Sequence, residues 1–197
     1  FRCLSTGRAT EMLARALLRG VRASADVNAH QLFLTEEDID GFDSNCHVSP
    51  PLRTMEDREA LRAAVARGDV SAICSDHQPH EEDAKLAPFP DTAPGISALE
   101  TLLPLTLRLV AEQVMDLPTA IARVTAGPAE ILGLPYGRVD EGRAADVCVF
   151  DPSALWVPGE STLVSQGRNT PFLGRELAGQ VSWTLLAGRI VFRREAS

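Results

Sequence analysis

The apolar residues among the first twenty positions recur at the spacing of one helix face. That face holds Ala9, Met12, Leu13, Ala16 and Leu17. Thr6 stands before the run as an N-cap residue, and Gly20 follows it as a stop signal. The pattern therefore predicts a helix here, followed by an extended run over residues 21–27.

Two further units repeat this order. A second helix is predicted to begin after Thr54, where Thr54 and Asp57 resemble a capping box, and to end at Gly68. The short apolar run over residues 70–75 is typical of a buried parallel strand. A third helix is predicted over residues 97–112, apolar nearly all round and kinked at Pro104. Alternating helices and strands predict an α/β layer or barrel.

The predicted secondary structure changes from helices to strands after residues 135–137 (PYG). Two more helices are predicted before this point, over residues 117–124 and 128–132. Short strands are predicted after it, over residues 147–150, 181–186 and 190–192. We therefore divide the chain into a strand–helix part, residues 1–135, and a β module, residues 136–197. A complete strand–helix barrel needs about 250 residues, so we expect this chain to be the later half of a larger protein, with the N-terminal half as a partner.

Composition narrows the class of partner. The 197 residues are 45% hydrophobic and carry 19 basic and 27 acidic side chains, a formal charge of −8. This balance supports a globular core and argues against nucleic acid or a membrane surface as a partner. No apolar run approaches the roughly 18 residues of a membrane span. The four cysteines form no CxxC pair, which is typical of reduced thiols in a cytoplasmic protein.

Two polar clusters could carry chemistry. Residues 75–80 (SDHQPH) follow the predicted strand, so Asp76 could ligate a metal or act as a general base, with His80 in the same pocket. Equally, Asp76 could cap a turn beside solvated histidines. Residues 45–53 (NCHVSPPLR) form the second cluster, in which Arg53 could orient a carboxylate or make a surface ion pair.

Together these clusters resemble the dihydroorotases of the amidohydrolase superfamily. The matching segments are residues 4–6 (LST), 26–30 (DVNAH), 49–53 (SPPLR), 75–80 (SDHQPH), 93–96 (APGI), 142–146 (GRAAD) and 169–174 (NTPFLG). The resemblance implies an α/β fold: the last strands and helices of a TIM-like barrel, followed by part of a composite β-sandwich.

The resemblance also implies a chemistry and a set of site residues. Dihydroorotases hydrolyse and form the amide ring of dihydroorotate at a zinc centre. By this resemblance Asp76 corresponds to the metal-ligating general base. The substrate-binding positions correspond to Ser49, His80 and the backbone of Pro94 and Gly95.

Several positions depart from the pattern of that family. Cys3 stands where the family has a ligand histidine, and a thiolate gives a softer metal site than imidazole. Ser49 replaces an asparagine, Gln78 replaces an alanine, and Gln31 replaces the second of two paired histidines. In these departures the chain resembles the non-catalytic dihydroorotase-like subunits that scaffold bacterial aspartate carbamoyltransferases, with no cofactor. The alternative is an active zinc dihydroorotase, because Asp76 and His80 remain.

Overall fold

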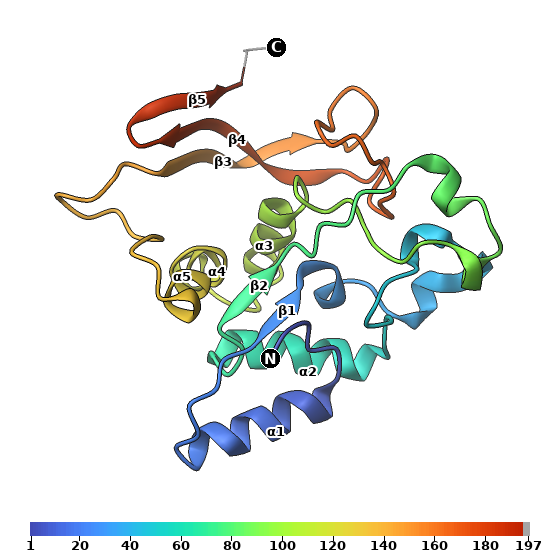
Figure 1. The fold of residues 1–197 in the computed structure, drawn as a ribbon, viewed down its shortest axis with the longest axis horizontal. Coiled ribbons are helices and arrows are strands. Elements are labelled where there is room, and N and C mark those ends of the chain that lie inside the picture. The colour runs from blue at the N-terminus through green and yellow to red at the C-terminus, as the bar shows by residue number, and fades with distance from the viewer. Residues whose placement is uncertain (195–197) are drawn as a thin grey trace.

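The computed structural model describes residues 1–194 (Figure 1). The helices are α1 (Gly7–Leu18), α2 (Met55–Arg67), α3 (Leu102–Ala111), α4 (Leu117–Val124) and α5 (Ala126–Leu132). The strands are β1 (Asp26–Asn28), β2 (Ala72–Cys74), β3 (Val147–Trp156), β4 (Leu177–Leu186) and β5 (Arg189–Arg193). Short 3₁₀ turns occupy parts of the loops that follow β1 and β2.

The strand–helix part is built on the parallel pair of β1 and β2, in which Asp26 is opposite Ala72 and Asn28 is opposite Cys74. The opening residues run along the other side of β1, since the Leu4 amide donates to the Asp26 carbonyl and the Asp26 amide donates to the Phe1 carbonyl. Both strands are shorter than the extended runs predicted from the sequence. Helices α1 and α2 cover this pair on one side (Figure 1).

Local capping explains the first two helices. The Thr6 hydroxyl accepts a hydrogen bond from the Ala9 amide at the start of α1, and the Thr54 hydroxyl accepts one from the Asp57 amide at the start of α2. Gly68 ends α2 in the left-handed conformation that glycine adopts at least cost. These predictions from the sequence are confirmed.

The third predicted helix begins later than expected. Helix α3 starts at Leu102, and Leu99, which falls within the predicted helix, leaves 59% of its surface exposed. The ring nitrogen Nδ1 of His77 accepts hydrogen bonds from the amides of Ala98 and Leu99, which holds this segment in a turn. Pro104 is then the third residue of the helix, where its missing N–H costs no intrahelical hydrogen bond, so the reason for expecting a kink disappears.

The β module forms an antiparallel sheet in the order β3-β4-β5. Ala187 and Gly188 make the tight hairpin turn between β4 and β5, with positive φ at both positions. The sheet lies over α3 in Figure 1, and Gly179 of β4 leaves room for the Leu107 side chain of that helix. The division of the chain at residue 136 stays a prediction.

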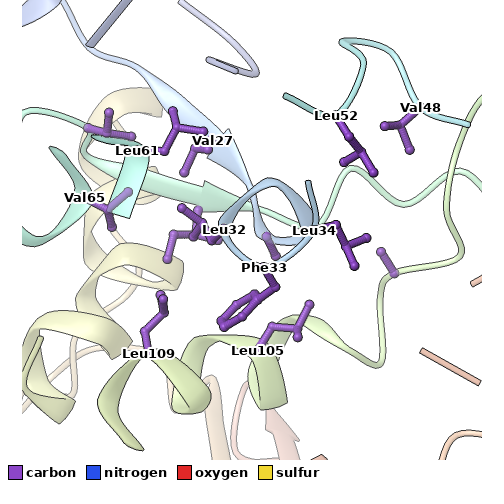
Figure 2. Packing of buried hydrophobic residues seen from close by; sticks show 14 of the residues in the cluster. Val27, Leu32, Phe33, Leu34, Val48, Leu52, Leu61, Val65, Leu105 and Leu109 are labelled. Atoms are coloured by element: carbon purple, nitrogen blue, oxygen red, sulfur yellow. The ribbon is translucent and has the colours of Figure 1, made fainter. Parts of the chain in front are cut away.

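The core lies between the parallel strands and the helices around them (Figure 2). Val27 comes from β1, Leu61 and Val65 from α2, and Leu105 and Leu109 from α3, and all of them are buried. Leu32 and Phe33, just after β1, fill the space between these elements. Such packing holds the carboxyl ends of β1 and β2 in place. No helix in the described part of the chain is long and apolar enough to cross a membrane.

Candidate functional site

Asp76 follows β2 by two residues and lies where the carboxyl ends of the parallel strands meet, the end at which barrel enzymes build their sites. Its φ of 47° is a left-handed conformation that is uncommon outside glycine. The Asp76 amide donates to the sulfur of Cys74 at 3.3 Å. This local turn directs the chain away from the strand and presents the carboxylate beside β1.

Two side-chain amides hold the Asp76 carboxylate. Asn28, the last residue of β1, donates from Nδ2 to Oδ2 at 2.8 Å. Gln78 donates from Nε2 to Oδ1 at 3.1 Å. Each carboxylate oxygen therefore accepts a hydrogen bond from an uncharged amide, and such bonds to a charged acceptor are the strong kind.

Cys3 lies in the same region, on the outer side of β1. Its amide donates to the Asp26 carboxylate at 2.7 Å, and its φ is 54°. Burial raises the pKa of the Cys3 thiol, and the negative charges of Asp76 and Asp26 raise it further, against a smaller opposing effect of Arg2. The environment thus favours the neutral thiol, whereas metal ions bind the thiolate.

The side chains gathered here do not by themselves complete a zinc site. Within residues 1–194 no group of three histidine, cysteine or acidic side chains is placed to hold a metal. Catalytic zinc sites use three protein ligands. Asp76 has an amide hydrogen on each oxygen, and burial raises the pKa of the Cys3 thiol. We therefore derive no reaction step through a metal at this site.

His80 is brought to the Pro94–Gly95 segment. Its Nε2 lies 3.1 Å from the Pro94 carbonyl, so that nitrogen carries the proton. Gly95 has φ 136°, and a Cβ there would stand 2.5 Å from the Cβ of Gln78 and 3.2 Å from His80 Nε2. The backbone of Gly95 therefore packs directly against Gln78 and His80, and only glycine fits.

Asn169 is the residue whose part in the site the sequence reasoning missed. It is 5% exposed, and its Oδ1 accepts the His80 amide at 2.8 Å. Its Nδ2 donates to the carbonyls of Gln78 at 3.0 Å and Gly95 at 2.9 Å. The signal was its place in the NTPFLG segment, for which the sequence reasoning proposed no role.

Ser49 lies apart from these contacts. It is exposed, and within the described chain its hydroxyl makes no hydrogen bond to Asp76 or His80. Its loop is nevertheless fixed to the site, because the Gly95 amide donates to the His47 carbonyl at 2.8 Å and Gln31 donates to the Pro50 carbonyl at 3.0 Å. Arg53 makes the surface ion pair, with Asp57 at 3.7 Å.

His30 lies at the start of the turn that follows β1 and is 1% exposed. Neither of its ring nitrogens has a hydrogen-bond partner in the described chain. Burial lowers its pKa to about 4, so the ring is neutral at physiological pH. His30 is thus a buried neutral side chain two residues after Asn28.

A pocket of about 530 Å³ opens beside His80. Asn169 and Arg168 line one side, and Ser44 and Lys85 line the other. The Lys85 ammonium donates to the carbonyls of Ser44 and Ala93, which ties the loop before Pro94 to the loop before His47. Burial lowers the pKa of Lys85, while the charge of Asp43 opposes that shift. The site can therefore hold a small polar molecule next to His80.

Known proteins resemble this chain in sequence. The chain is 51% identical over 190 residues to the dihydroorotase-like protein of Pseudomonas aeruginosa, covering 96% of this chain and 45% of that protein. It is 43% identical over 190 residues to the dihydroorotase of Syntrophotalea carbinolica, with the same two coverages. The chain thus spans just under half the length of the curated relatives it matches.

Solved structures share the fold. The L-hydantoinase from Arthrobacter aurescens matches with a TM-score of 0.90 at 24% identity, over 98% of this chain and 44% of that one. The D-hydantoinase from Thermus sp. matches with a TM-score of 0.89 at 23% identity, over the same shares. These neighbours support the prediction of a partial TIM-like barrel. The family model described as "Amidohydrolase family" matches residues 14–191, so the chain belongs to the amidohydrolase family.

Proposed function

We propose that the protein is a dihydroorotase-like partner of pyrimidine biosynthesis that binds aspartate carbamoyltransferase catalytic chains and does not itself hydrolyse dihydroorotate. The observation that carries this proposal is the hydrogen bonding of the Asp76 carboxylate. Amides of Asn28 and Gln78 occupy both carboxylate oxygens, and the described residues offer no set of three metal ligands.

The names of the relatives support a dihydroorotase-like protein. The Pseudomonas aeruginosa relative is named a dihydroorotase-like protein. The scaffold role follows from the resemblance of Cys3, Ser49 and Gln78 to the non-catalytic subunits. On this proposal no cofactor is needed, and the fold serves as a binding surface in the cytoplasm.

A second candidate is an active zinc dihydroorotase. Asp76 at the strand end and His80 beside Pro94 and Gly95 favour it, as does the Syntrophotalea carbinolica relative named dihydroorotase. Other ligands would then have to come from an N-terminal half of the same protein. In that case Asp76 would be one of the residues that hold the zinc, and its carboxylate would also be the general base for cleavage of the ring amide.

The test compares the two candidates in the full-length protein. Zinc content is measured by plasma mass spectrometry, dihydroorotate hydrolysis by loss of ring absorbance, and association by co-purification with aspartate carbamoyltransferase. We expect no stoichiometric zinc, no hydrolysis above background and a stable complex. Near-stoichiometric zinc, with hydrolysis that Asp76→Asn abolishes, would instead establish the enzyme.

Asp76→Asn is also the control for the co-purification experiment. On our proposal this variant co-purifies with aspartate carbamoyltransferase as well as the native protein does, since the carboxylate has no chemical step to perform. Absence of any complex, in both native and variant proteins, would contradict the scaffold role.

A further inference from the structure

A second pocket, of about 330 Å³, lies away from Asp76 and His80. Three arginines line it: Arg58 of α2, Arg108 of α3 and Arg175 from the segment before β4. Phe33 and Phe172 are among its apolar lining residues. Three guanidinium groups around one small pocket stand out in a chain whose formal charge is −8.

The arginines are held in place before any ligand arrives. Arg108 lies over the Phe33 ring at 4.9 Å and donates through Nε to Glu112 at 2.7 Å. Arg175 lies over the Phe172 ring at 5.7 Å. Arg58 donates through Nη1 to the Phe33 carbonyl at 3.4 Å. Stacking on rings limits the freedom these side chains would lose on binding, which favours affinity.

Free donors remain on these groups. Within the described chain the guanidinium of Arg175 makes no hydrogen bond or ion pair, and Arg108 uses Nε alone. Arg58 differs from them, because its Nε and Nη2 both contact the Glu59 carboxylate in addition to the bond from Nη1 to Phe33. Free N–H groups thus remain on arginines that line one small pocket, and planar guanidinium forks recognise a carboxylate or phosphate in two-point fashion.

Two acidic residues, Glu37 and Asp38, line the pocket together with the three arginines. Asp38 uses its Oδ2 to accept the Thr35 amide at 2.8 Å, as part of a capping box. Glu37 is exposed and makes no ion pair among the described residues. It is therefore the one carboxylate of the lining whose removal would change the local charge without breaking a cap.

We infer that this arginine pocket binds a small oxyanion, either a phosphate group or a carboxylate, as a site separate from that of Asp76. The guanidinium forks of Arg108 and Arg175 supply the hydrogen bonds, and Arg58 adds charge from the helix opposite. The inference does not depend on whether the protein is an enzyme, because Asp76 and His80 are not among the residues that line this pocket.

The test is isothermal titration of the full-length protein with inorganic phosphate and, separately, with malonate, at constant ionic strength in chloride buffer. We expect saturable binding of one anion per chain for at least one of the two, and the tighter one identifies the ligand class. Arg175→Gln and Arg108→Gln should each weaken that binding about ten-fold, the loss of one charge-assisted hydrogen bond. Glu37→Gln should strengthen it about two-fold by removing a nearby like charge.

Arg22→Gln is the matched control, since Arg22 is exposed, carries the same charge and lies outside the pocket. We expect this variant to keep the native affinity. The inference is overturned if neither anion binds saturably, or if the Arg175 and Arg108 variants bind as tightly as the control.

Discussion

Asn169 and His80 lie 89 positions apart in the chain, yet the Asn169 side chain accepts the His80 amide at 2.8 Å. The same asparagine donates to the carbonyls of Gln78 and Gly95, so one side chain from the segment before β4 joins both halves of the candidate site. The site is thus fixed by the connection to the β module as well as by the parallel strands.

Asn169→Ala should lower the free energy of unfolding by about 3 kcal/mol, because it removes three hydrogen bonds and leaves buried carbonyl and amide groups without partners. Urea denaturation of the full-length protein measures this loss. Asn45→Ala is the matched control, since the half-buried Asn45 makes no side-chain hydrogen bond in the described chain, and we expect it to cost less than about 0.5 kcal/mol. Equal losses in the two variants would contradict the role of Asn169.

Gly95→Ala should cost about 3 kcal/mol or more, since the new Cβ would meet Gln78 at 2.5 Å at a φ of 136°. Gly142→Ala separates the two causes, because Gly142 also has a positive φ, 80°, but no atom within 4 Å of its Cβ position. That control should lose about 1 kcal/mol from backbone strain alone. Similar stabilities of the two variants would show that the contact with Gln78 is not tight.

Asp76→Asn tests the paired amides. An asparagine offers one acceptor oxygen to two amide donors, so we expect a loss of about 2 kcal/mol in unfolding free energy, measured in the presence of a chelator. Asp140→Asn, at an exposed residue paired with Arg143 at 3.2 Å, should change stability by less than about 1 kcal/mol. A gain in stability on Asp76→Asn would mean instead that the carboxylate is an unrelieved charge kept for a cation.

Local features could be predicted from the sequence, and contacts between distant segments could not. The Thr54–Asp57 pattern gave the start of α2 because a cap involves residues three positions apart. The start of α3 was placed too early because the His77 ring, 21 and 22 positions back, takes the amides of Ala98 and Leu99. Periodicity of apolar residues carries no information about such a contact.

The same limit applies to the site. An apolar run ending in SDHQPH predicted that Asp76 follows a strand, since both features lie within a few residues of each other. The hydrogen-bond partner Asn28 lies 48 positions away on β1. Such contacts around Asp76 decide whether its carboxylate is free to ligate a metal. The sequence predicts that Asp76 lies at the end of a strand, whereas its hydrogen bonds can be known only from the tertiary structure.

His30 should make the protein sensitive to acid. Its pKa is about 4 when folded and about 6.5 when unfolded, so the unfolded chain takes up the proton first as the pH falls. Stability is therefore complete above pH 6.5 and declines as the pH drops toward 4. Between pH 7.5 and pH 5 this one group should cost about 2 kcal/mol of unfolding free energy.

The measurement is urea denaturation of the native protein and of His30→Leu at both pH values and one ionic strength. Leucine fills a similar volume in the core and cannot titrate, so the variant should lose about 2 kcal/mol less than the native protein over this range. Other groups that titrate in this range contribute to both proteins alike, and the difference between them isolates His30. An identical pH dependence in the two proteins would mean that His30 is protonated in the folded state, and that its buried ring nitrogens have a partner after all.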